Sequence, residues 1–103
     1  MRMSREYQTF QAFYPYYLSQ HSHRVCRRLH FIGSSLVLAT TLYIVLTGAW
    51  VLLWLLPFLG YGFAWAGHFF FEKNTPATFS YPLFSLAGDW VMFGDMLKGK
   101  IKF

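Results

Sequence analysis

The histidines of this chain lie next to its two longest apolar runs. His30 comes directly before the run Phe31–Thr47, and His68 lies two residues after the run Ala49–Ala66. If the chain folds back at Gly48, both imidazoles lie at the same end of a hairpin, about 27 and 30 Å from the turn along a helix. Neutral imidazole is a common ligand of iron, zinc and copper. The spacing therefore predicts a metal site at one rim of a hairpin.

Two carboxylates are candidates for catalysis or ligation. Glu72 follows His68 at i+4 spacing, so a helix carries both side chains on one face. Imidazole with carboxylate is the ligand set of non-haem iron(II) oxygenases and of many zinc hydrolases. The alternative is that Glu72 caps a helix or pairs with Lys73 or an arginine of His21–Arg28. Asp89 lies in an apolar stretch, where a carboxylate is costly and usually functional. It either orients a histidine, binds the metal or pairs with Arg27 or Arg28.

Other polar side chains precede the first apolar run. A helix through this segment places His23 on the same face as His30, whereas a loop does not, and the spacing leaves both open. Arg27 and Arg28 either report membrane topology or hold a substrate carboxylate through a bidentate pair. Cys26 is a soft ligand by type, although a single buried thiol is usually inert.

The composition is that of a membrane protein. Of the 103 residues, 55% are hydrophobic and 13% are charged, whereas soluble domains carry about 25% charged residues. The net charge of +5 is spread thinly, which disfavours nucleic acid as a partner and suits anionic lipid headgroups. The length predicts one domain over residues 1–103, and a single cysteine excludes an internal disulfide.

Helical segments are expected in four regions. Apolar residues recur at helical spacing over Ser4–Leu18, which predicts an amphipathic helix on the membrane surface or against the bundle, kinked or ended by Pro15. Leu29–Thr47 contains no Asp, Glu, Lys or Arg and is long enough to span a bilayer. Ala49–Phe71 is a second such segment, with prolines and glycines that membrane helices tolerate. Phe79–Leu97 contains two aspartates, so it either packs Asp89 inward, as a third helix partly inserted or shielded by the other two, or lies at the interface.

Basic residues set the expected orientation. Five arginines precede the first span, Lys73 follows the second, and the turn at Gly48 has none. The positive-inside rule places both ends of the hairpin, and the metal site, on the cytoplasmic side. A third span would carry the C-terminal lysines outside, against that rule. The expected fold class is all-α: a membrane helical bundle with a transmembrane hairpin, an N-terminal amphipathic helix and a third apolar helix that is re-entrant or interfacial.

Three motifs carry a resemblance to a known family. The first is YLSQH at Tyr17–His21 followed by RRLHFIG at Arg27–Gly33. The second is GYGFAWAGH at Gly60–His68 followed by FEKNTPA at Phe71–Ala77, and the third is YPLFSLAGD at Tyr81–Asp89. Together they cover nearly the whole chain. They resemble a family of small membrane proteins that includes the fungal 2-hydroxy fatty acid dioxygenase.

The resemblance implies an Fe(2+)-dependent dioxygenase that uses O2 to remove one carbon from 2-hydroxy fatty acids. Carried over by position, the metal ligands are His21, His30 and His68, whereas His23 falls outside the motif. Cys26 stands where many relatives have asparagine. The third motif is similar to bacterial members, so the inner membrane of a bacterium is the expected location.

A fatty acid would meet iron at the rim while its tail stays among the lipid chains. Arg27 or Arg28 would neutralise the substrate carboxylate, and Glu72 and Asp89 are the candidate catalytic carboxylates. Two alternatives stay open: a non-enzymatic haem binder with His30 and His68 as axial ligands from facing helices, and a metal-dependent lipid hydrolase that needs no O2. A transporter is disfavoured because neither apolar run contains a carboxylate. Whether the chain forms a homo-oligomer is also open.

Overall fold

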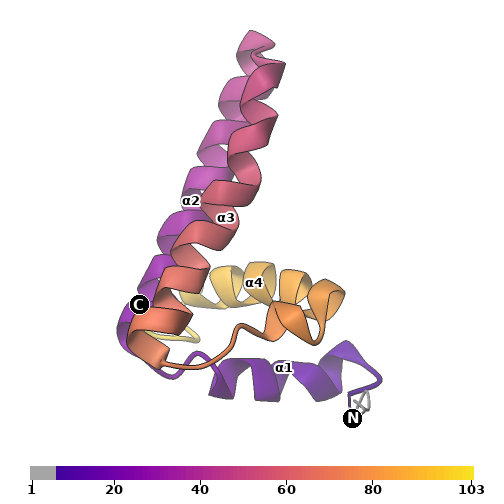
Figure 1. The fold of residues 1–103 in the computed structure, drawn as a ribbon, viewed down its shortest axis with the longest axis vertical. Coiled ribbons are helices and arrows are strands. Elements are labelled where there is room, and N and C mark those ends of the chain that lie inside the picture. Colours follow the sequence, from indigo (N-terminus) through magenta and orange to yellow (C-terminus); the bar gives the residue numbers. More distant parts are fainter. Residues whose placement is uncertain (1–6) are drawn as a thin grey trace.

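The computed structural model describes residues 7–103, and this part of the chain is all-α. An upright hairpin of α2 and α3 has α4 and α1 extending sideways from its base (Figure 1). This confirms the membrane-bundle fold class. The helical elements are α1 (Phe10–Ser19), α2 (Arg24–Thr47), the 3-10 helix η1 (Trp50–Trp54), α3 (Leu55–Ala66), the π-helix η2 (Gly67–Glu72), the 3-10 helix η3 (Ala77–Phe79) and α4 (Pro82–Leu97).

The hairpin turns at Gly48, as the sequence predicts. This residue has a φ of 73°, and its N–H donates to the carbonyl of Ile44 at 2.8 Å. Because glycine has no Cβ, it takes this left-handed conformation at little cost and ends the helix. The chain then returns to the base of the hairpin through η1, α3 and η2, which together form the 23-residue helical segment Trp50–Glu72. Its last turn contains His68.

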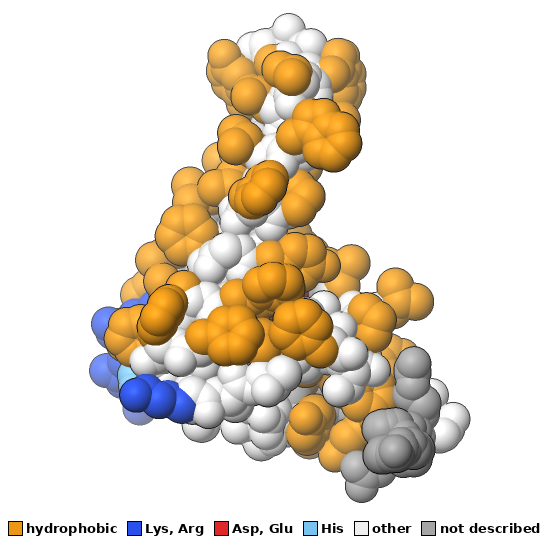
Figure 2. Space-filling view, in the orientation of Figure 1, with side chains coloured by type: hydrophobic (Ala, Val, Ile, Leu, Met, Phe, Trp, Pro, Cys, Tyr) orange, Lys and Arg blue, Asp and Glu red, His pale blue; other side chains and the backbone are white. Residues whose placement is uncertain are grey.

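Both rods of the hairpin are long and apolar enough to cross a membrane. Their most apolar windows have mean hydropathies of 1.8 and 1.4, yet only 17% and 11% of those windows are buried inside the protein. A core helix of a soluble protein would be mostly buried. Hydrophobic side chains cover the projecting half of the hairpin (Figure 2), and Leu46, Val51, Trp54 and Phe58 are each at least 74% exposed. Such a surface suits hydrocarbon as its solvent.

The helices at the base pack on each other through an aromatic core. Phe13 and Tyr17 of α1 meet Met92 and Met96 of α4, and all four are buried. The helix α1 continues past Pro15 to Ser19, so this proline does not end it. The predicted start of this helix at Ser4 lies outside the described residues.

The third apolar segment runs across the hairpin and not alongside it (Figure 1). Its helix α4 has 16 residues and begins with Pro82 at the first turn, where a missing N–H costs nothing. The hydroxyl of Tyr14 donates to Asp95 at 2.8 Å, which ties α4 to α1. This arrangement agrees with the interfacial alternative for Phe79–Leu97.

Candidate metal centre

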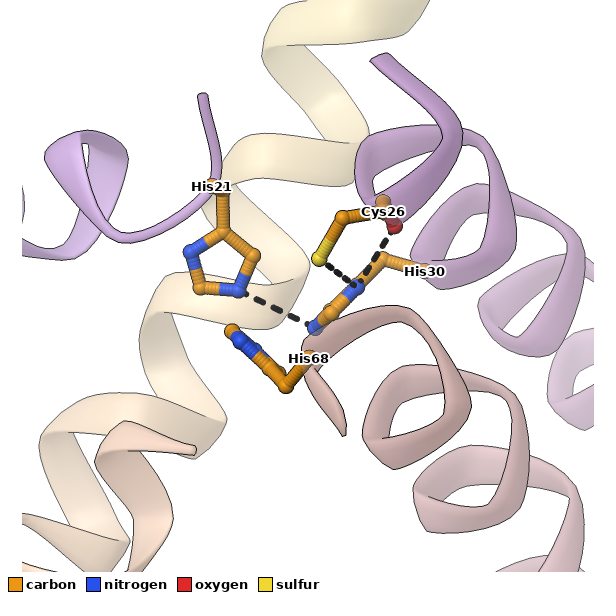
Figure 3. Close-up of side chains that lie close together, drawn as sticks. All are labelled: His21, Cys26, His30 and His68. Carbon is orange, nitrogen blue, oxygen red and sulfur yellow. Dashed lines mark hydrogen bonds between the residues drawn. The ribbon is translucent and has the colours of Figure 1, made fainter. Parts of the chain in front are cut away.

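Three imidazoles that are remote in the sequence converge at the base of the hairpin (Figure 3). His21 follows α1, His30 lies on α2, and His68 lies in η2. Their ring centroids are 4.4 Å apart for His21 with each of the other two, and 5.0 Å for His30 with His68. All three are at most 6% exposed. With the sulfur of Cys26, their ligand atoms lie within 4.8 Å of one another, so the group could hold a metal ion.

The end of α1 carries His21 into this group. Its ring stacks on the buried ring of Tyr17 with centroids 4.0 Å apart. Its Nδ1 lies 2.7 Å from the carbonyl oxygen of Tyr17, and its backbone N–H donates to Leu18. The guanidinium of Arg27 donates to the carbonyl of His21 at 3.1 Å. The side chain and backbone of this residue are therefore both fixed.

The hydrogen bonds at Nδ1 determine which nitrogen of each ring carries the proton. The Nδ1 of His30 lies 2.9 Å from the carbonyl oxygen of Cys26, and that of His21 also faces a carbonyl. Since a carbonyl oxygen only accepts, both Nδ1 atoms are protonated when the rings are neutral. Each Nε2 then presents a lone pair, as a metal ligand must.

Asn74 fixes the third ring in the same way. Its Oδ1 lies 2.7 Å from the Nδ1 of His68. The orientation of this amide is set by its NH2 group, which donates to the backbone carbonyl and the side-chain oxygen of Gln20 at 3.0 Å each. The Oδ1 atom therefore accepts from Nδ1–H, and the Nε2 of His68 is also left as a ligand.

The donor set fits a transition-metal ion. The Nε2 atoms of His21 and His30 lie 3.0 Å apart, and two facing lone pairs at this distance repel unless a cation or proton lies between them. Burial, followed by the neighbouring imidazoles, lowers the pKa of His21 well below its usual value, so a proton does not relieve this repulsion near neutral pH. Two metal ligands at about 2.0–2.1 Å and a right angle are about 3 Å apart. Imidazole suits iron, zinc and copper.

Glu72 does not join the histidines, although its i+4 spacing from His68 suggested that it would. Its two carboxylate oxygens accept from the hydroxyl of Ser22 and the backbone N–H of His23, at 2.6 Å each. This is the start of α2, where unsatisfied N–H groups and the helix dipole attract negative charge. The Nδ1 of His23 accepts from Val25 at the same helix start, so neither residue contributes to the cluster.

The two candidate substrate-binding arginines contact backbone oxygens. Arg27 donates to Ser22 and, through Nε, to Lys102. Arg28 donates to Phe103 at 3.1 Å, and its guanidinium lies 5.0 Å from the ring centroid of that residue. Lysines and arginines gather at this corner of the hairpin base (Figure 2). The arginines hold the C-terminal segment against α2, and the described contacts do not place them among the imidazoles.

Asp89 lies next to the cluster and is linked to it through Tyr17. The Tyr17 hydroxyl donates to its carboxylate, and the Tyr17 ring stacks on His21. Burial raises the pKa of Asp89 to about 6, although the bond from Tyr17 acts in the opposite direction. Asp89 and His30 line a cavity of about 260 Å³. They also line a space of about 10 Å³ together with His68, which is about the room that one water molecule needs.

Sequence reasoning did not identify Tyr17, Gln20 or Asn74 as part of this centre, and it left the role of Cys26 open. A signal for two of them exists: Tyr17 and Cys26 each lie four residues before a histidine, the spacing of one helical turn. The sulfur of Cys26 lies 3.8 Å from the Nδ1 of His30, the nitrogen that already faces a carbonyl. The roles of Gln20 and Asn74 have no periodic signal because both lie in connecting segments.

Comparison with known proteins gives one match. No curated protein and no solved structure matches the chain significantly. A protein-family description, "2-hydroxy-palmitic acid dioxygenase Mpo1-like", matches residues 7–101. This range includes the three clustered histidines, Cys26, Asn74 and Asp89. The match spans almost the full sequence and agrees with the family suggested by the three motifs. The chain therefore belongs to the Mpo1-like family.

Proposed function

We propose that this protein is an Fe(2+)-dependent dioxygenase that shortens 2-hydroxy fatty acids by one carbon at a membrane surface. The observation that carries the proposal is the convergence of three buried imidazoles, each with Nδ1 bonded to an oxygen and with ligand atoms within 4.8 Å of one another. The family description supports the reaction class and the kind of substrate.

His21, His30 and His68 would hold the ion. Three protein ligands leave coordination positions for substrate and O2, as open-site oxygenases require. Bound iron would supply the redox chemistry that amino-acid side chains lack. Zinc fits the same donors but has no redox chemistry, so a redox-active metal such as iron agrees with a dioxygenase.

The remaining residues would orient the three imidazoles and the substrate. Asn74 and the carbonyl oxygens of Tyr17 and Cys26 keep the three rings in one tautomer and one orientation. Asp89, which lines the space beside His30 and His68, would hold a proton or accept a hydrogen bond from the 2-hydroxyl group of the substrate. Glu72 would act indirectly, by fixing the start of α2.

The site would face the cytoplasm of a bacterium, at the inner membrane. The base of the hairpin carries Arg24, Arg27 and Arg28 and the C-terminal lysines, whereas the turn at Gly48 carries no charge. The positive-inside rule supports this orientation. A substrate that dissolves in the inner leaflet would then reach the imidazoles without leaving the lipid.

The haem alternative agrees less well with the geometry. A porphyrin would have to fit between the rings of His30 and His68, whose centroids are 5.0 Å apart, and the space beside these rings is only about 10 Å³. A hydrolase would use the same three ligands, so dependence on O2 separates that alternative.

The test combines metal content with turnover. Protein purified without oxygen is assayed for bound metal and for conversion of 2-hydroxypalmitate to the acid one carbon shorter, with and without O2. We expect about one iron per chain and turnover that requires O2. His30→Ala and His68→Ala should lose both, whereas His23→Ala, outside the cluster, should keep both. Zinc with O2-independent lipid cleavage would establish the hydrolase, and protein that binds no metal and leaves the substrate unchanged would refute the proposal.

A further inference from the structure

A cavity opens between three helices and reaches the metal centre at one end. Its volume is about 260 Å³, which is small beside the usual binding site for a whole ligand of drug size. It is partly open to the surroundings. The lining residues are His30, Ser34 and Val37 of α2, Leu56, Pro57, Gly60 and Tyr61 of α3, and Leu86, Asp89 and Trp90 of α4.

The cavity follows one face of each helix. His30, Ser34 and Val37 lie at i, i+4 and i+7, so they form a single stripe on α2 that extends about 10 Å from the imidazole toward the Gly48 turn. On α3, Leu56 and Gly60 are likewise one turn apart. The cavity therefore runs along the hairpin, away from the polar base and toward the apolar half.

The chemistry of the lining changes along this direction. His30 and Asp89 mark the end at the metal centre, and both also line the small space beside His68. Toward the turn the lining is almost entirely apolar, with Val37 on α2 and Leu56 and Pro57 on α3. A ligand with one polar end and an aliphatic body suits such a lining.

We propose that this cavity holds the part of the acyl chain nearest the reacting head group, and that Gly60 keeps it wide enough to do so. The proposal rests on the function proposed above. A Cβ added to Gly60 would meet only Cγ2 of Val37, at 3.7 Å. The space beyond this glycine is therefore open, and a larger side chain there would occupy the cavity. The rest of the tail would leave through the open side into the lipid.

Helix α3 provides a matched control. Gly62 lies two residues further on, is exposed and does not line the cavity, and a Cβ there meets nothing within 4 Å. Leucine at either position makes the same change of composition and helix propensity. Only Gly60→Leu narrows the cavity.

The experiment is photo-crosslinking of the intact, metal-loaded protein under anaerobic conditions. The probe is a 2-hydroxy fatty acid with a diazirine on the first third of its tail, and labelled peptides are mapped by mass spectrometry. We expect labels on the cavity-lining residues of α2, α3 and α4, blocked by excess 2-hydroxypalmitate. Gly60→Leu should reduce this labelling about tenfold or more, Gly60→Ala should reduce it less, and Gly62→Leu should leave it unchanged.

Labels confined to lipid-facing residues such as Trp54 and Phe58, or equal losses in both leucine variants, would overturn the cavity assignment. Because no turnover is needed for labelling, this result is independent of the oxygenase test. If the protein is labelled specifically but never consumes O2, the acyl-chain site is supported and the proposed dioxygenase reaction is refuted. Helicity and metal content of each variant show that it is folded, and Gly60→Ala, whose Cβ fits without strain, tests the cavity if the leucine variant does not fold.

Discussion

The Oδ1 atom of Asn74 lies 2.7 Å from the Nδ1 atom of His68, and the NH2 group of the same amide donates twice to Gln20. A side chain from the loop after η2 thus joins a histidine of the hairpin to the residue that follows α1. One amide sets both the tautomer of an imidazole and the position of the chain that carries His21.

Replacing Asn74 should therefore weaken metal binding, although Asn74 itself does not contact the metal and acts through His68. Asn74→Ala leaves the buried Nδ1–H of His68 without its acceptor, and loss of such an outer partner typically costs 10–100-fold in metal affinity. Asn74→Asp keeps an acceptor and should lose less, although it gives up the donors to Gln20. Metal titration of the purified variants measures this order. Equal affinities of wild type and Asn74→Ala would contradict the orienting role.

The pH dependence of the free energy of unfolding should reveal the titration of the Asp89 carboxyl group. Its folded pKa of about 6 exceeds the usual unfolded value of about 3.9, so the protonated form is favoured in the folded state. Protonated Asp89 therefore contributes up to about 3 kcal/mol to the free energy of unfolding. This contribution is fully present below about pH 4 and is lost as the pH rises to about 6. Since histidines titrate in the same range, the informative quantity is the difference between wild type and Asp89→Asn. That difference in unfolding free energy should fall between pH 4 and pH 6 and then level off; parallel curves would rule this out.

Gly88 and Gly94 offer a matched pair on α4. A Cβ on Gly88 would lie 2.9 Å from the ring of Tyr17, whereas one on Gly94 meets nothing within 4 Å. Gly88→Ala should therefore displace the ring that supports His21 and destabilise the protein by about 1–3 kcal/mol. Gly94→Ala should stabilise it by about 0.5–1 kcal/mol, because alanine favours the helix. Chemical denaturation in detergent measures both; the same sign for both substitutions would be inconsistent with this packing.

Removal of the metal should loosen α1 more than the hairpin. In the proposed site, His21 is the ligand that joins α1 to the other two, so a bound ion would link this helix to α2 and η2. Ligand binding at a hundred times the dissociation constant stabilises by about 2.7 kcal/mol. Chelation should increase hydrogen exchange in residues 10–21 and leave residues 37–60 unchanged. His21→Ala should exchange in this way with or without metal, and uniform changes along the chain would exclude this coupling.

The fold followed from the sequence because its signals are local. Two uncharged runs of membrane length and a glycine between them are enough to predict the hairpin, and similar distances from Gly48 bring His30 and His68 to nearly one level. The position of His21 relative to them depends on how α1 packs against α4, which is a tertiary contact. Only the resemblance to the family named His21 as a ligand.

The misjudged partner of His68 has a physical cause. The i+4 rule brings Glu72 to the same face as His68, but it does not show what else competes for the carboxylate. The N–H groups at the start of α2, 49 residues away in the sequence, are that competitor. Asn74 takes the place next to the imidazole from a loop, where no helical periodicity exists to reveal it.

The π-helical geometry of η2 makes the number of residues in this stretch important. A π turn holds one residue more than an α turn and commonly occurs at functional sites. Deleting one of Phe69, Phe70 and Phe71 would restore ordinary winding and rotate Glu72 and Asn74 about the axis relative to His68. Substituting another apolar side chain for one of these phenylalanines would keep the winding, but a lost or gained codon here would separate the imidazole from its amide and α2 from its cap in a single event.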